Sequence, residues 1–211
     1  MCGRTELNTE WSELAAALGI PLPTVAPPDR TLPALNVPPT AAVPVVVSEP
    51  GASNLTLTVM RWGFPAVWAE KPWSRPRFNA RAESADRRGA WAEPRAGRRC
   101  LVPVTGFYEW IGPRGRRVPM RIGAAGGGLL TLAGVWDRFE RDGAQVDCVT
   151  VLTTAANPTV APVHDRMPVI LSPERRELWL DPDAERRDVA PLLRPWSGAL
   201  TVTEADLKRA A

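Results

Sequence analysis

The sequence is poor in residues that bind metals or form disulfides. It has one histidine and three cysteines in 211 residues. The cysteines, Cys2, Cys100 and Cys148, are odd in number and show no CxxC spacing, which argues against a disulfide framework and against a zinc ribbon or finger. A single histidine, His164, also makes a poor ligand set for a catalytic metal, so we expect no metal and no cofactor.

Long apolar segments are also missing. The longest apolar runs, such as AAVPVVV at 41–47, fall far short of the roughly 20 residues that a membrane helix needs. The N-terminus shows no basic segment followed by an apolar core and a cleavage site. We therefore expect a cytoplasmic protein with no membrane partner.

Positive and negative charges are nearly equal in number. Basic residues outnumber acidic ones by 26 to 23, and nearly all of them are arginine, whose planar guanidinium suits phosphate better than an ammonium group. This small excess allows a polyanionic partner without requiring one, and GC-rich coding would enrich arginine in the same way. The length fits one globular unit, so we expect residues 1–211 to form a single domain.

Hydrophobic periodicity predicts more strands than helices. One helix is expected after Thr9 as N-cap and up to Gly19, a second at 83–93, and a third after Ser172 with Pro173 in its first turn. The proline-rich stretch 21–44 is expected to be irregular, and GAAGGG at 123–128 to be a hairpin tip. Strands are expected at 43–47, 55–60, 98–104, 106–111, 118–122, 128–136, 147–154 and 199–203.

These elements favour an α+β fold. The strands do not alternate regularly with helices, as they would in a parallel sheet. We expect a curved, mainly antiparallel, barrel-like sheet with a few flanking helices.

The opening segment, MCGR, suggests chemistry at the N-terminus. Removal of Met1, which a small second side chain favours, would leave Cys2 with a free α-amine beside its thiol. An α-amine has a pKa of about 7.7–8.0, so it is partly neutral and nucleophilic near pH 7. The amine can attack an aldehyde to give an imine, and the thiol can then close a five-membered thiazolidine. A small buried cysteine without a role is the equally open alternative.

Two further residues could move protons. His164 lies in PVHDRMPVIL beside Asp165 and Arg166, and histidine is the side chain best suited to proton transfer near neutral pH. A hydrogen-bonded structural histidine is the alternative. Glu109 lies between aromatic residues in GFYEW, where burial would favour a general acid or base. Strand alternation would equally allow Glu109 to point to solvent.

Aromatic residues and arginines alternate in RWGFPAVW at 61–68 and RFNARAES at 77–84. Aromatic rings could stack on unpaired bases, arginines could neutralise phosphates, and an asparagine can both donate and accept hydrogen bonds. A buried aromatic core with a solvated arginine face is the alternative. The residues in question are Trp62, Phe64, Trp68, Arg61, Arg77, Arg81 and Asn79.

Eight segments, in order along the chain, resemble the SOS-response-associated peptidase (SRAP) family, the abasic-site-processing proteins. They are MCGR, LNVPPT, RWGFPAVW, FNARAES, RRCLVPVTGFYEW, LAGVWD, VLTTAAN and VHDRMPVIL. Each is weak alone, but eight in sequence are specific. The resemblance implies that the protein binds single-stranded DNA and links its N-terminal cysteine, as a thiazolidine, to the ring-opened aldehyde of an abasic site during the DNA damage response.

The resemblance also implies a role for each matching residue. Cys2 would be the nucleophile and Asn79 would hold the sugar and the cysteine. Glu109 would be the acid and base of imine formation and ring opening. His164 would shuttle protons on the sugar, including steps of a lyase reaction or of crosslink reversal. The implied DNA contacts are Arg4, Arg81 and Arg166 on phosphates, Trp68 and Trp110 as lining aromatics, and Pro39 as a wedge beside the lesion.

Other function classes stay open at this point. Class II glutamine amidotransferases also begin with Met-Cys-Gly, and a literal peptidase would use Cys2, Glu109 and His164 to remove Met1 or an N-terminal extension. A non-covalent single-stranded-DNA-binding module would instead give reversible binding that weakens with salt. In each DNA-binding interpretation we expect a monomer.

Overall fold

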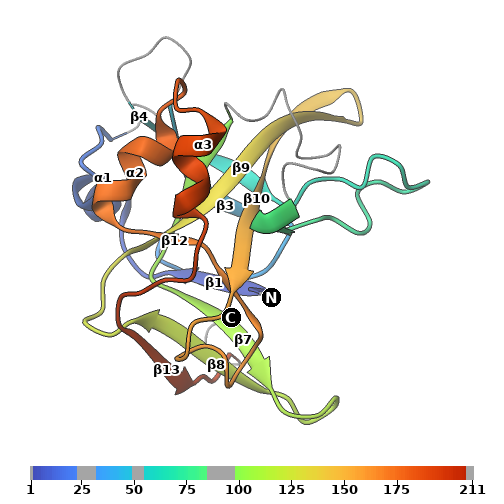
Figure 1. Cartoon of the computed structure of the whole chain (residues 1–211). Helices are drawn as coiled ribbons and strands as arrows, with labels where there is room; N and C mark the ends of the chain where they lie inside the picture. The colour runs from blue at the N-terminus through green and yellow to red at the C-terminus, as the bar shows by residue number, and fades with distance from the viewer. Residues whose placement is uncertain (1, 23–31, 49–54, 85–97, 208–211) are drawn as a thin grey trace.

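Two β-sheets make up most of the molecule (Figure 1). The computed structural model describes residues 2–22, 32–48, 55–84 and 98–207. Buried apolar residues from both sheets and from the helices join in one hydrophobic cluster. The α+β fold expected from the sequence is confirmed.

The larger sheet closes into a five-stranded barrel in the order β10-β4-β3-β6-β9, with β9 pairing back onto β10. All these pairs are antiparallel except β4 with β10, which run parallel at Cys148 and Val149. Closure removes the exposed strand edges that would otherwise invite pairing with other chains. The barrel strands are β3 (Ala42–Ser48), β4 (Leu55–Trp62), β6 (Arg99–Val104), β9 (Leu130–Arg141) and β10 (Ala144–Ala155).

The smaller sheet has the order β13-β8-β7-β1-β2 and is antiparallel throughout. In Figure 1 the labelled strands β7, β8 and β13 lie below the barrel, with β1 between them and it. The N-terminal residues therefore enter the molecule where the two sheets meet. These strands are β1 (Arg4–Leu7), β2 (Ala34–Val37), β7 (Gly106–Ile111), β8 (Val118–Ala124) and β13 (Leu200–Glu204).

Short elements extend the barrel. Strands β5 (Asn79–Arg81) and β11 (Arg166–Pro168) both pair with the C-terminal half of β10, where Thr153 is in register with Arg81 and with Pro168. Strand β12 (Ile170–Leu171) pairs with β9. The central strand β10 therefore brings the NARAE and HDRMP segments to the two sides of one strand.

Helices cover the barrel on one side (Figure 1). They are α1 (Trp11–Leu18), α2 (Pro173–Leu180) and α3 (Arg186–Val189). Two 3-10 turns, Ala82–Ser84 and Ala190–Leu192, complete the helical elements of the described residues. A buried arginine of β6, Arg99, ties α2 to the barrel by donating to the carbonyls of Trp179 and Ala184 at 2.7 and 3.2 Å and to that of Asp181. No helix in the described parts of the chain is long and apolar enough to cross a membrane.

The helix starts are only partly as expected. Ser172 is the N-cap of α2 and Pro173 its first residue, as the sequence indicates. The N-cap of α1 is Glu10 and not Thr9, because Glu10 and Glu13 form a reciprocal capping box. Thr9 instead donates its hydroxyl to Glu13 at 2.9 Å.

Three expectations about connections need correction or fall outside the described residues. The stretch 21–44 is not irregular throughout, because it contains β2 and the start of β3. GAAGGG is not a hairpin tip, because β8 and β9 belong to different sheets and the segment crosses between them. Of the helix expected at 83–93, the structure describes only the end of a 3-10 turn, and 85–97 lie outside the described residues.

Candidate active site

Cys2 is completely buried where the N-terminal segment meets β5. Its carbonyl oxygen accepts a hydrogen bond of 2.9 Å from Nδ2 of Asn79, and its thiol donates to the carbonyl of Arg4 at 3.6 Å. Burial, and after it the negative charge of Glu109, raises the pKa of the Cys2 thiol far above its ordinary value. In the chain that carries Met1, burial therefore favours the protonated thiol over the thiolate.

Asn79 begins β5 and is held in register with Val151 of β10. While its Nδ2 binds Cys2, its Oδ1 is buried and has no hydrogen-bond partner among the described residues. A buried acceptor without a donor is costly, so such an atom often marks the place of a ligand. The amide of Asn79 thus offers one acceptor beside the N-terminal residue.

Glu109 lies on β7, opposite Met120 of β8, and is only 4% exposed. The solvent-facing alternative for Glu109 is therefore wrong. Its carboxylate is close enough to Cys2 for its charge to act on the thiol. A buried carboxylate beside a protonated thiol can exchange a proton with the reacting groups without competition from bulk water.

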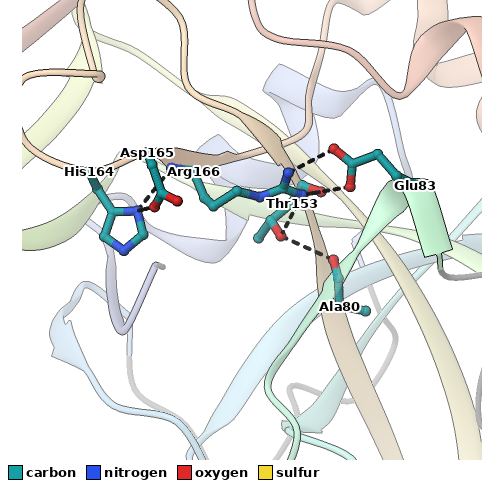
Figure 2. A network of polar contacts seen from close by, with 6 residues as sticks. All are labelled: Ala80, Glu83, Thr153, His164, Asp165 and Arg166. Carbon is teal, nitrogen blue, oxygen red and sulfur yellow. Dashed lines mark hydrogen bonds and ion pairs between the residues drawn. The ribbon is translucent and has the colours of Figure 1, made fainter.

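His164 lies two residues before β11 and is tied to the rest of the site through Arg166 (Figure 2). The guanidinium of Arg166 forms two bonds to the carboxylate of Glu83, at 2.7 and 2.8 Å, which lower the pKa of Glu83. Arg166 also donates to the carbonyl of Thr153 at 2.6 Å, and the Thr153 hydroxyl donates to the carbonyl of Ala80 at 3.2 Å. This network links the strand that follows His164 to the strand that carries Asn79.

Nδ1 of His164 has two close polar neighbours. The backbone N–H of Arg166 donates to it at 2.9 Å, and a carboxylate oxygen of Asp165 lies 2.8 Å away. Figure 2 shows Nδ1 turned toward these two groups and Nε2 on the far side of the ring.

The aromatic and basic segments divide into core and surface. Trp62 and Phe64 are buried, so for these two residues the alternative of an aromatic core holds and the stacking surface does not. Trp68 is 58% exposed, and the guanidinium of Arg77 lies 4.0 Å from its ring centroid. A second stack was not expected from the sequence: Trp73 lies near Arg61 and Arg141, each 5.4 Å from its ring centroid.

The other expected DNA contacts are spread over three elements. Arg81 is exposed at the end of β5. Trp110, on β7, and Pro39, in the turn after β2, are both partly buried. In that turn the N–H of Ala41 donates to the carbonyl of Pro38 at 3.2 Å.

Two arginines expected to face phosphate already have protein partners. Arg166 binds Glu83, as described above. Arg4 donates to the side-chain and backbone oxygens of Asn36 at 2.8 and 3.3 Å, and the Asn36 amide donates to the carbonyl of Leu207 at 3.3 Å. Asn36 and Glu83 lie within the LNVPPT and FNARAES segments, so the segments were visible in the sequence while these two contacts were not.

No group of three or more histidine, cysteine or acidic side chains that could hold a metal occurs among the residues that the structure describes.

The family model described as "SOS response associated peptidase (SRAP)" matches residues 1–207. The chain belongs to this family. The match therefore extends over almost the whole sequence, to the residues that follow β13.

Similar proteins agree with this assignment. The abasic site processing protein YoqW of Bacillus subtilis is 31% identical over 201 residues, which cover 93% of this SRAP chain and 88% of YoqW. The abasic site processing protein HMCES of Gallus gallus is 29% identical over 235 residues, 92% of this chain and 70% of its own. A crystal structure of a protein from Bacteroides thetaiotaomicron has the same fold, with a TM-score of 0.81 at 23% identity, covering 97% of this chain and 92% of its own.

Proposed function

We propose that this SRAP protein binds single-stranded DNA and captures abasic sites covalently through Cys2. The proposal rests on one observation above all: the Asn79 amide holds the carbonyl of Cys2 while leaving a buried acceptor beside it. That acceptor suits the α-amine that Met1 removal would create, or a hydroxyl of a bound sugar. The names of YoqW and HMCES, both abasic site processing proteins, support the same substrate.

The first step is opening of the sugar. An abasic site is largely a cyclic hemiacetal, and its C1′–O4′ bond breaks when O4′ gains a proton and the C1′ hydroxyl loses one. Glu109, buried near Cys2, can take the hydroxyl proton and return it to O4′, which leaves an aldehyde. The aldehyde carbon is the electrophile that the N-terminal amine attacks.

The raised pKa of the Cys2 thiol implies an order for the next two steps. The neutral α-amine adds first, and Glu109 carries a proton from the nitrogen to the leaving hydroxyl, so that loss of water gives the imine. The thiol then adds across the C=N bond: sulfur bonds to C1′, its proton leaves to Glu109, and the nitrogen gains a proton. The net change is aldehyde plus aminothiol to thiazolidine plus water.

Binding of the strand would use the exposed stack of Trp68 and Arg77. An exposed ring offers a flat face for an unpaired base, and the guanidinium of Arg77, which lies against the ring, supplies positive charge for a phosphate. The exposed Arg81 of β5 offers a second positive charge. Such contacts are independent of sequence, as expected of a protein that recognises a missing base.

The burial of Cys2 disfavours a hydrolase of the amidotransferase type. That reaction needs a thiolate that attacks an amide, and burial stabilises the protonated thiol. Imine chemistry needs the amine first and the thiol second, which a protonated sulfur allows.

A denaturing gel with Met1-free protein tests the proposal. Wild-type protein, its mass confirmed, is mixed with a single-stranded oligonucleotide that carries one abasic site, and an intact oligonucleotide serves as a control. We expect a shifted band that depends on the lesion and on Cys2. A Cys148→Ala variant, which removes another buried thiol, should still give this band.

A second variant separates the two halves of the aminothiol. Cys2→Ser keeps the α-amine but removes the sulfur, so it should give an adduct only when borohydride reduces the imine. Cys2→Ala should behave in the same way. Stable adducts formed by either variant without borohydride would refute the thiazolidine.

A further inference from the structure

Nδ1 of His164 cannot use both of its neighbours at once. A ring nitrogen of neutral imidazole either carries a proton and donates, or carries a lone pair and accepts. The Arg166 N–H, at 2.9 Å, requires the lone pair. The Asp165 carboxylate, at 2.8 Å, requires the proton. The two contacts therefore belong to two different proton arrangements of the same ring.

Each arrangement gives Nε2 a different chemical character. When Nδ1 accepts from Arg166, the neutral ring carries its proton on Nε2, which can donate a hydrogen bond but cannot take up a proton. When Nδ1–H donates to Asp165, Nε2 has a lone pair and can act as a base. The carboxylate thus favours the arrangement in which the outward nitrogen of His164 is a base.

The two neighbours differ in how firmly they are held. The backbone of Arg166 pairs with Ala155 of β10, and its side chain is fixed by Glu83 and Thr153. The position of its N–H is therefore set by the barrel. The side chain of Asp165, in contrast, is 82% exposed, so water competes for its carboxylate. Replacing Asp165 should therefore change the ratio of the two proton arrangements of His164, while the Arg166 N–H stays in place.

We propose that Asp165 is a positioning residue that makes Nε2 of His164 a base. The proposal rests on the proposed function, because the base acts on the imine between Cys2 and the opened sugar. Nε2 takes a proton from C2′, a C2′=C3′ double bond forms, and the C3′–O bond breaks with its electron pair leaving on the phosphate. His164 is left as an imidazolium whose Nδ1–H donates to Asp165, which stays ionised. The result is strand cleavage at the lesion.

Nuclear magnetic resonance can read this arrangement directly, because the chain has one histidine. Protein labelled with ¹⁵N-histidine gives imidazole signals from His164 alone, and the ¹⁵N shifts distinguish Nδ1–H from Nε2–H. At a pH where the ring is neutral, we expect a substantial Nδ1–H population in the wild type. Asp165→Ala should convert it to Nε2–H, and Asp165→Asn should give an intermediate result. Asp183→Asn, on an exposed residue after α2, is the matched control.

The same variants are then assayed for strand cleavage in a Cys2→Ser background, which cannot close the thiazolidine and so leaves the imine exposed. We expect Asp165→Ala to slow cleavage by about 10-fold or more, which is part of the roughly 10²–10⁴ that general acid–base catalysis contributes, because His164 itself remains in place. Imine formation, trapped by borohydride, should change by less than about 2-fold. Melting curves show whether each variant is folded.

The outcomes separate the two proposals. If the wild type forms no imine or adduct, the proposed function fails, and the ¹⁵N shifts still decide whether Asp165 controls His164. If the adduct forms but the wild type is already entirely Nε2–H, the role of Asp165 is refuted. Equal cleavage rates for Asp165→Ala and its parent would refute it as well.

Discussion

Replacing Arg121 by methionine would test how the smaller sheet supports the N-terminal strand. Glu6, on β1, is only 6% exposed although it carries a charge. Arg121 of β8 binds it through Nε at 2.7 Å and Nη2 at 2.6 Å, and the hydroxyl of Tyr108 donates to its second oxygen. Burial and the contact with Glu6 raise the pKa of Tyr108, so its hydroxyl remains a donor. Gly106 and Gly123 leave room for the guanidinium of Arg121, since a Cβ at Gly123 would lie 2.7 Å from its Nη1.

The expected cost follows from leaving Glu6 buried without its cation. Removing one partner of a fully buried pair costs about 3–5 kcal/mol. Because the side chain of Arg121 is 34% exposed, water can reach the pair, and we expect about 2–3 kcal/mol for Arg121→Met. For a chain of this length that corresponds to a fall in Tm of roughly 4–12 °C.

Urea and thermal unfolding, followed by circular dichroism, measure this cost. The double variant Glu6→Gln with Arg121→Met should be more stable than Arg121→Met alone, because it leaves no unpaired charge. Two results would contradict the reasoning. One is a loss of less than about 0.5 kcal/mol for Arg121→Met, which is the usual range for surface changes. The other is a double variant no better than the single one.

Three further changes test other parts of the structure. Trp68→Ala should weaken binding to single-stranded DNA by about 1–3 kcal/mol, or roughly 5–150-fold, in fluorescence anisotropy, whereas Leu178→Ala, on another exposed apolar residue, should not. Arg99→Met should lower the free energy of unfolding in urea by about 2–4 kcal/mol, since it leaves carbonyls at the end of α2 without a donor. Glu83, whose pKa is lowered by Arg166, adds stability that is present above its ordinary pKa of 4.5 and is lost as the pH falls through the lower folded value. Glu83→Gln should therefore reduce stability at neutral pH by at most about 1 kcal/mol, because the carboxylate is half exposed, and should flatten the acid limb of the unfolding curve.

The longer strands were predictable because they bury continuous apolar runs. Strand β6, for example, is buried at every position, and its sequence RCLVPV is almost entirely apolar. Strand β2 was missed because it lies in the proline-rich stretch 21–44. Strand β1 was missed because its sequence is not apolar. RTEL carries two charges, and its Glu6 is buried only because Arg121 and Tyr108 come from other strands to meet it. Local periodicity cannot report a contact that lies more than a hundred residues away.

The path of GAAGGG shows the same limit at the level of topology. The glycines correctly indicate a turn, but whether a turn joins paired strands depends on where the next strand finds its partners. Leu130 begins a strand that pairs with β6 and β10, because the barrel needs β9 to close. The turn therefore crosses between sheets.

At the candidate site, the sequence alone determined the reagents: a cysteine at position 2, an asparagine, a carboxylate between aromatic residues and one histidine, each in a recognisable segment. Only the tertiary structure decided their state. Burial keeps the Cys2 thiol protonated, the amide of Asn79 holds the N-terminal residue, and Glu109 faces inward rather than to solvent. These properties depend on dielectric environment and on contacts between distant strands, and a linear order of residues specifies neither until the chain has folded.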